Sequence, residues 1–232
     1  MIFLILAGIG CIAILIIGHW WPRLKLKRWR KALALDKHER ALNEIYAPVN
    51  GFLLSKAARK SNDAFEYVYG EIDFESFVAL LTLCKPDEKT CFYDLGSGTG
   101  KAVLAFTMVF DGYKSCGIEL FSNLHYCAQT RQQRLSQLND YRTKATHITF
   151  KHSDFLDVSF PDATLVFINA TAFFAERWLQ ISRHIEQVKP GTLVISTSKA
   201  LDSNLFITKT VTPVRMSWGV VNAYIQERSL GG

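Results

Sequence analysis

A glycine-rich turn between a short apolar run and a helical pattern constrains the fold of this chain more than any other feature. Residues 91–95 predict a buried strand, residues 96–100 contain three glycines, and residues 101–110 predict a helix. Glycines in such a turn allow the backbone to reverse tightly and to approach a ligand closely. Short strands and helices continue to alternate downstream, which is typical of crossover connections in a parallel sheet.

Six further strands are expected after this turn. They cover residues 115–120, 148–152, 163–169, 192–198, 206–212 and 222–228. Further helices are expected at 122–138 and 175–188, and the second of these ends at Lys189-Pro190-Gly191. The last two strands are typical of a closing antiparallel pair. We therefore predict an α/β fold, a Rossmann-like seven-stranded mixed sheet with helices on both faces.

The glycine turn lacks the spacing that phosphate-binding loops need. A P-loop requires a glycine five residues before the Gly-Lys pair and a Ser or Thr after it, but Leu95 and Ala102 occupy those positions. A dinucleotide fingerprint requires a third glycine where Lys101 stands. Asp94 at the strand end would also repel a pyrophosphate. These features disfavour a nucleoside triphosphatase and a dinucleotide-dependent enzyme.

An acidic residue stands at the carboxyl end of each of the first three predicted strands. These residues are Asp94, then Glu119, 23 residues after Gly96, and then Asp154, which precedes Phe155. The carboxyl ends of the strands are where open α/β sheets bind ligands, so we expect these groups to converge. A cup of carboxylates suits a ligand that is positively charged and carries no phosphate. S-adenosylmethionine (SAM), with its ammonium and sulfonium groups, fits this description.

Five motifs in order resemble class I SAM-dependent methyltransferases, and in particular the disruptor-of-telomeric-silencing family of histone-lysine methyltransferases. The likeness runs from about Glu66 to Gln226. The matching motifs are Val68-Tyr69-Gly70-Glu71, Asp94-Leu95-Gly96-Ser97-Gly98-Thr99-Gly100, Ser153-Asp154-Phe155, Asn169-Ala170-Thr171-Ala172-Phe173 and Ser217-Trp218.

This resemblance implies a role for each motif. The residues expected to bind the cofactor are Tyr69, Glu71, Asp94, Gly96, Gly98, Gly100, Glu119, Asp154, Phe155 and Asn169. Within this set, Asp94 and the glycines would contact the methionine part, Glu119 the ribose, and Asp154 with Phe155 the adenine. The expected catalytic residues are Asn169, Tyr69 and Trp218. The side-chain carbonyl of Asn169 would orient the amine, and Trp218 with Phe173 would line the channel for the target lysine.

The N-terminal part of the chain predicts a membrane anchor. Ile2 to Gly18 is an uncharged run of 17 residues, followed by Trp20, Trp21 and a cluster of basic residues. About 20 residues span a bilayer core, and basic residues on the C-terminal side place the rest of the chain in the cytoplasm or an equivalent matrix. We therefore predict a single-pass transmembrane helix over residues 1–22, ahead of the α/β domain.

The segment after the anchor is strongly basic. Arg23 to Lys60 contains 11 Lys and Arg against 3 Asp and Glu, whereas the rest of the chain contains 16 against 18. Residues 23–64 are expected to form an amphipathic helical juxtamembrane segment, broken near Pro48–Gly51, that contacts anionic lipid headgroups. A solvated connector is the alternative interpretation. The remaining domain, 65–232, is mildly acidic, which disfavours nucleic acid as a partner.

The expected substrate is a protein with an accessible lysine. The chain departs from the family pattern at Ile72, at Lys101 and in having the single Asn169. Its layout of anchor and domain is similar to the lysine methyltransferases that act on the c-subunit of ATP synthase. Two alternatives stay open: a methyltransferase for a lipid, quinone or other membrane-borne small molecule, and a catalytically inactive membrane adaptor. The five cysteines show no metal-binding spacing, so no metal site is expected.

Overall fold

The computed structural model describes residues 23–58 and 70–230. These residues belong to two compact units, which divide between Ala41 and Leu42. The predicted transmembrane helix over residues 1–22 and the predicted domain boundary at 64 and 65 lie outside the described residues. Among the residues that are described, no helix combines the length and the apolar character needed to cross a bilayer.

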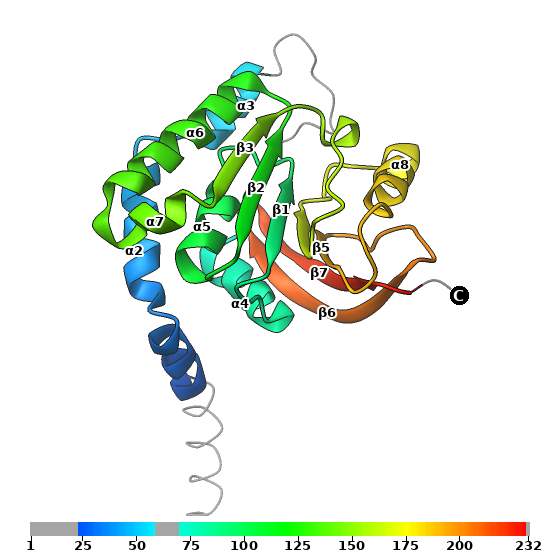
Figure 1. Ribbon diagram of the computed structural model, residues 1–232, viewed down its shortest axis with the longest axis horizontal. Coiled ribbons are helices and arrows are strands. Elements are labelled where there is room, and N and C mark those ends of the chain that lie inside the picture. The colour runs from blue at the N-terminus through cyan, green and yellow to red at the C-terminus, as the bar shows by residue number, and fades with distance from the viewer. Residues whose placement is uncertain (1–22, 59–69, 231–232) are drawn as a thin grey trace, which may run out of the picture. The chain divides into compact units, whose positions relative to one another are not determined.

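The strands of the second unit form one mixed sheet in the order β3-β2-β1-β4-β5-β7-β6 (Figure 1). The strands are β1 (Cys91–Leu95), β2 (Lys114–Glu119), β3 (Ile148–His152), β4 (Leu165–Ile168), β5 (Leu193–Thr197), β6 (Phe206–Met216) and β7 (Gly219–Arg228). The first five are parallel, and β7 runs antiparallel to both of its neighbours. The prediction of a seven-stranded mixed sheet is confirmed for the described residues.

Helices cover both faces of this sheet, as the sequence predicts. The helices are α2 (Leu35–Tyr46), α3 (Gly51–Ala58), α4 (Phe74–Cys84), α5 (Lys101–Val109), α6 (Ser122–Gln137), α7 (Arg142–Ala145) and α8 (Ala175–Ile185), with short 3₁₀ turns at Asn139–Tyr141 and Phe155–Asp157. Tyr93 and Leu95 of β1 pack in one core cluster with α8 residues such as Trp178. Phe92 stacks on Phe106 of α5, with ring centroids 4.5 Å apart. Alternate residues of β1 therefore enter different cores, because strand side chains point to opposite faces.

The closing hairpin is longer than the sequence predicts. Strands β6 and β7 extend to Met216 and back to Gly219, so Ser217 and Trp218 form the turn between them. A register irregularity lies between Thr208 and Thr210 of β6. This extension carries Trp218 to the carboxyl edge of the parallel strands, which the shorter predicted strands would not do.

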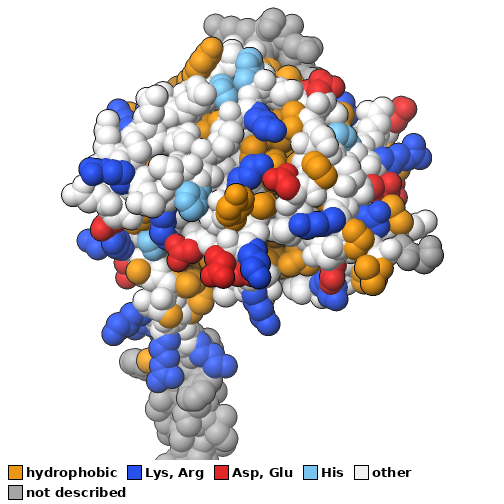
Figure 2. Space-filling view, viewed as in Figure 1, with side chains coloured by type: hydrophobic (Ala, Val, Ile, Leu, Met, Phe, Trp, Pro, Cys, Tyr) orange, Lys and Arg blue, Asp and Glu red, His pale blue; other side chains and the backbone are white. Residues whose placement is uncertain are grey.

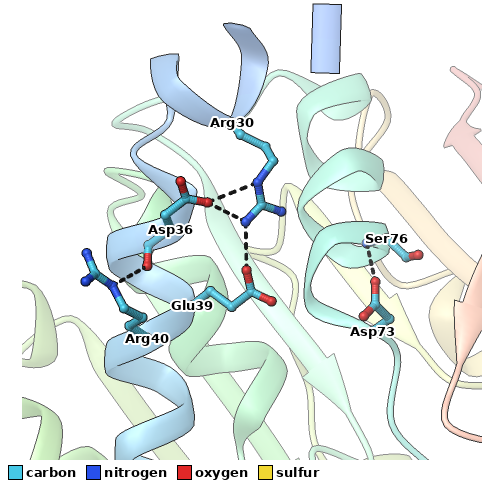
Figure 3. Close-up of polar contacts among 6 residues, drawn as sticks. All are labelled: Arg30, Asp36, Glu39, Arg40, Asp73 and Ser76. Atoms are coloured by element: carbon cyan, nitrogen blue, oxygen red, sulfur yellow. Dashed lines mark hydrogen bonds and ion pairs between the residues drawn. The ribbon is translucent and has the colours of Figure 1, made fainter. Parts of the chain in front are cut away.

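The basic segment is helical but has one break more than expected. The expected break is present, since α2 ends at Tyr46 and α3 begins at Gly51. A second break follows the helical residues 23–32, where Ala34 has a φ of 48°. Arg30 crosses this second break: its Nη2 atom lies 2.6 Å from Asp36 Oδ1 and 2.8 Å from Glu39 Oε2 (Figure 3). These ion pairs hold together the two helical pieces of the first unit.

Helix α4 was not predicted, although it supports the functional site. Its sequence, Phe-Glu-Ser-Phe-Val-Ala-Leu-Leu-Thr-Leu-Cys, is apolar nearly all round, so its periodicity does not separate a helix from a strand. Asp73 caps its first turn by accepting a hydrogen bond from the Ser76 amide at 3.1 Å (Figure 3). Asp73 also donates its own amide to the Arg215 carbonyl of β6 at 2.9 Å. The cap therefore fixes where α4 begins relative to the closing hairpin.

Removal of this cap is expected to destabilise the domain. Asp73→Ala should lower the free energy of unfolding by about 1 kcal/mol, because a helix N-terminal amide loses its acceptor. Asp73→Asn retains a side-chain oxygen at the same place and should stay within a few tenths of the wild-type value. Urea unfolding followed by far-ultraviolet circular dichroism measures both. Equal losses in the two variants would contradict the capping role.

Candidate active site

A cavity of about 330 Å³ opens at the carboxyl ends of the central strands. The sequence-predicted site residues that line it are Glu71, Asp94, Gly96, Gly98, Glu119, Asp154, Phe155, Asn169, Phe173 and Trp218. Gly100 does not line it, and Tyr69 lies outside the described residues. The structure thus brings together side chains that are spread over nearly 150 residues of sequence.

The glycine turn forms the floor of the cavity. The amides of Gly96 and Ser97 donate to the Ile118 carbonyl of β2 at 2.9 and 3.0 Å, which fastens the turn to the neighbouring strand. Gly100 has a φ of 80°, and a Cβ atom there would lie 2.5 Å from the Phe150 ring. Its role is therefore to let the turn pass close to β3 before α5 begins, whereas Gly96 and Gly98 face the cavity.

Asp94, at the end of β1, is a buried carboxyl group for which the described residues provide no counter-ion. It is 3% exposed, and within the described parts of the chain no hydrogen bond reaches its side chain. Burial, and then the nearby charge of Glu119, raise the pKa of Asp94 to about 8. Such a group is stabilised by any cation that enters the cavity.

Glu119, at the end of β2, holds the glycine turn in place. Its Oε2 atom accepts a hydrogen bond from the Gly98 amide at 2.8 Å, and its Oε1 atom accepts one from the Phe121 amide at 2.8 Å. Burial raises the pKa of this carboxyl, while these amide bonds act in the opposite direction. A carboxylate offers about four acceptor positions, so Glu119 can also bind hydroxyl groups in the cavity.

Asp154 follows β3 and caps the short turn that carries Phe155. Its Oδ1 atom accepts from the Leu156 amide at 2.9 Å, and its Oδ2 atom lies 3.3 Å from Nη2 of Arg177. The Phe155 ring is nearly perpendicular to that of Phe173, with centroids 6.0 Å apart. This wall combines a flat apolar surface with a carboxylate that can accept a hydrogen bond.

Asn169 is held differently from the expectation drawn from its sequence. Its side-chain carbonyl accepts hydrogen bonds from the Thr171 and Thr197 hydroxyls at 3.0 and 2.7 Å. Its amide nitrogen donates to the Gly70 carbonyl at 3.1 Å. Both acceptor positions of the oxygen are thus in use, so in this structure the carbonyl does not face an incoming amine. Asn169 instead ties the end of β4 to the Gly70–Glu71 segment.

The Gly70–Glu71 segment pairs with the tip of the closing hairpin. Ser217 donates its amide to the Glu71 carbonyl at 2.8 Å, and the Glu71 amide donates to the Ser217 hydroxyl at 3.2 Å. The Trp218 ring lies directly on Gly70, where a Cβ atom would come within 1.7 Å of it. Gly70 is therefore required by close approach, and two motifs that are far apart in the sequence meet here.

Residues 54–223 match the family model described as "Histone methylation protein DOT1". The chain belongs to this family. It is also 32% identical over 144 residues to the "Histone-lysine N-methyltransferase, H3 lysine-79 specific" of Caenorhabditis elegans. That match covers 59% of this chain but only 15% of the length of the relative. The sequence-based prediction of a class I SAM-dependent methyltransferase with the motifs of this family is confirmed.

Solved structures show the same fold at lower identity. An RNA methyltransferase from Salinibacter ruber in complex with S-adenosyl-L-homocysteine superposes with a TM-score of 0.56 at 19% identity, over 68% of this chain and 93% of that one. TrmN from Thermus thermophilus superposes with a TM-score of 0.54 at 16% identity, over 66% of this chain and 48% of that one. The DOT1-family chain therefore shares the fold of these two solved structures.

The cavity of this DOT1-family chain contains two groups that the sequence analysis missed. One is an aromatic wall of Phe74, Phe77 and Phe167, in which the rings of Phe77 and Phe167 lie 5.1 Å apart. The other is the ion pair between Lys101 and Glu71, with the Nζ and Oε2 atoms 2.8 Å apart. Phe74 and Phe77 lie on the unpredicted helix α4. Lys101 departs from the family pattern in the sequence. Its ion-pair partner, Glu71, lies 30 residues earlier in the chain, so the sequence does not indicate the pair.

The buried Asp94 is expected to make the stability of the DOT1-family chain depend on pH. A folded-state pKa of about 8 lies above the unfolded value of about 3.9, so the folded form binds a proton that the unfolded form releases. The free energy of unfolding should therefore fall between about pH 4 and pH 8, by up to about 1.4 kcal/mol per pH unit.

Asp94→Asn removes this titration and is the test. Relative to the wild type, the variant should gain stability as the pH rises from 6 to 8, and the gain should level off above pH 8. Urea unfolding at several pH values, without added nucleoside, measures the difference. A difference between the two proteins that does not change with pH would contradict a buried, titrating Asp94.

Proposed function

We propose that this chain transfers a methyl group from SAM to the side-chain amine of a lysine in a protein substrate. The single observation that carries the proposal is the buried Asp94 carboxylate, which has no counter-ion in the described residues and faces a cavity at the strand ends. A ligand with an ammonium group would stabilise the ionised form of Asp94, and SAM carries such a group but no phosphate. The S-adenosyl-L-homocysteine bound to the Salinibacter ruber neighbour supports this choice.

The other cavity residues fit the remaining parts of SAM. Glu119 retains acceptor positions for the ribose hydroxyls beyond its two amide bonds. Asp154 and the Phe155 ring provide an acceptor and an apolar face for the adenine. Lys101 and Glu71 line the same cavity and bring one positive and one negative charge to it. When bound, SAM supplies a methyl group on a positively charged sulfur.

The aromatic wall explains how a lysine amine becomes reactive. An unperturbed lysine has a pKa of about 10.4, so its amine is protonated near neutral pH. Phe74, Phe77 and Phe167 are each less than one tenth exposed and line the cavity together with Trp218. Such apolar surroundings disfavour the charged form and lower the pKa of the amine. On this account the chain needs alignment and desolvation rather than a dedicated general base.

A histone lysine is the first substrate to test, because the family model and the C. elegans relative both concern histone methylation. A lipid, a quinone or another membrane-borne acceptor is the second candidate. The uncharged run from Ile2 to Gly18 favours it. A catalytically inactive adaptor fits less well, since the buried carboxylates cost stability without a ligand.

Two substitutions should separate cofactor binding from methyl transfer. Asp94→Ala should abolish binding of SAM, because the ammonium loses its counter-ion. Trp218→Ala should leave binding nearly unchanged and reduce turnover at least tenfold, because the lysine channel loses a wall. Titration calorimetry and single-turnover transfer of a labelled methyl group measure the two effects. The exposed Asp157→Ala is a matched control and should behave as the wild type.

The same labelled reaction identifies the acceptor. Nucleosomes and native membranes are incubated with labelled SAM and the wild-type chain, and the protein and lipid fractions are counted separately. Label in lysines of a protein, absent with Asp94→Ala, supports the proposal. Label only in the lipid fraction favours the second candidate. Equal loss of SAM binding in the Asp94→Ala and Trp218→Ala chains would contradict the division of roles.

We further propose that residues 2–18 tether the chain to a membrane, with the domain on the cytoplasmic side. The sequence supports this through its uncharged run and the basic residues that follow it. The described part of the first unit begins with a group of exposed basic residues: Arg23, Lys25, Lys27, Arg28 and Lys31. Figure 2 shows several blue Lys and Arg side chains at the lower end of the described residues. Each basic residue near anionic headgroups contributes about 1 kcal/mol.

The tether and the basic surface can be tested separately. Extraction of membranes with alkaline carbonate should leave the full chain in the pellet and release a variant that lacks residues 2–18. The released variant should co-sediment with vesicles that contain phosphatidylserine but not with pure phosphatidylcholine. Exchange of Arg23, Lys27, Arg28 and Lys31 for Gln should weaken that binding at least tenfold. Binding that does not depend on anionic lipid would defeat the lipid contact.

A further inference from the structure

The segment 42–58 is built into the cavity, although most of it precedes the part of the chain that matches the family model. Leu42 and Ser55 line the cavity, and each is 1% exposed. The family match begins only at residue 54. The upstream helix end therefore contributes to the site without being part of the family signature.

Tyr46, the last residue of α2, reaches the glycine turn. Its hydroxyl donates a hydrogen bond to the Thr99 carbonyl at 2.8 Å, across 53 residues of sequence. Thr99 lies between Gly98, whose amide binds Glu119, and Gly100, which precedes α5. The Tyr46 side chain is nearly buried, with 7% of the residue exposed. The hydrogen bond is thus largely shielded from water.

The end of α2 is fixed independently of the turn that it contacts. Arg131 of α6 donates a hydrogen bond to the Ile45 carbonyl at 2.9 Å, and both residues are buried. Asn123, also in α6, donates to the Leu54 carbonyl at 2.8 Å. Helix α6 therefore holds this segment on both sides of the break at residues 47–50, so the Tyr46 hydroxyl has a defined position from which to act.

The glycine turn is the part of the site that most needs such support. Gly96, Gly98 and Gly100 all have positive φ values. Glycine loses more conformational freedom on ordering than any other residue, so a glycine-rich turn is costly to fix in one conformation. Glu119 and Ile118 hold the turn from the sheet side, and Tyr46 holds it from the opposite helix.

We propose that Tyr46 is a positioning residue of the cofactor site, which fixes the Thr99 carbonyl and thereby orders the Gly98–Lys101 backbone for SAM. This inference rests on the proposed function, because it concerns affinity for that cofactor. Tyr46 acts through the turn and not on the reacting atoms. Its loss should therefore weaken cofactor binding and leave methyl transfer at saturating SAM unchanged.

The test compares Tyr46→Phe with Tyr113→Phe in the full chain. Tyr113 is 68% exposed and does not line the cavity. Its substitution therefore removes a tyrosine hydroxyl group, as Tyr46→Phe does, without removing a contact to the glycine turn. Titration calorimetry with S-adenosyl-L-homocysteine should give a dissociation constant about fivefold higher for Tyr46→Phe, as expected for one neutral hydrogen bond. Tyr113→Phe should match the wild type. The kcat at saturating SAM should be the same in all three proteins.

Amide hydrogen exchange separates positioning from general destabilisation. In Tyr46→Phe the amides of residues 98–101 should exchange faster, while those of β1 and β4 keep their wild-type rates. Equal acceleration throughout the sheet would assign Tyr46 a structural role and overturn the proposal. So would a wild-type dissociation constant or a lowered kcat. Failure of the wild-type chain to bind S-adenosyl-L-homocysteine would contradict the proposed function itself. The wild-type chain is therefore measured before the variants, so that this failure is distinguished from a failure of the role proposed for Tyr46.

Discussion

The arrangement of this site depends on two buried carboxylates at the ends of adjacent parallel strands. Asp94 and Glu119 are each less than a tenth exposed, and the nearby charge of Glu119 adds to the cost of ionising the buried Asp94. Glu119 offsets that cost with two amide bonds, whereas no described residue does the same for Asp94. A parallel sheet with its helices on both faces leaves such an edge open. The unfavourable free energy of burying Asp94 therefore arises at the edge of the sheet, where a cationic ligand in the cavity can lower it.

The second organising feature is the long closing hairpin. Because β6 and β7 extend beyond the parallel strands, their turn reaches the Gly70–Glu71 segment and forms antiparallel contacts with it. Trp218 then covers Gly70, and Asn169 binds the Gly70 carbonyl from the other side. Three segments from the beginning, the middle and the end of the domain thereby meet at the cavity, which is also lined by aromatic residues of α4 and β4.

Membership in the DOT1 family and the upstream sequence bear on different properties of the chain. The family match and the fold bear on the cavity at the carboxyl ends of the parallel strands. The segment 42–58 lies largely upstream of that match, yet Tyr46 contacts the glycine turn and Leu42 lines the cavity. The basic residues from Arg23 to Lys31 belong to a separate unit, and the proposed contact with anionic lipid concerns them.

The sequence alone was sufficient to place the three carboxyl groups together: Asp94 and Glu119 lie at the ends of β1 and β2, Asp154 follows β3, and parallel strands bring such residues to one edge. It was also sufficient for the family, because the motifs are local and ordered. It was not sufficient for α4, whose apolar residues lack a diagnostic period, or for the hydrogen-bond partners of the Asn169 side chain, which accepts from two hydroxyls and donates to one carbonyl. Only tertiary structure decided that Lys101 pairs with Glu71, that Trp218 rests on Gly70 and that Tyr46 holds Thr99. These contacts join residues 30, 148 and 53 positions apart, and their partners are chosen by how the helices and the hairpin pack.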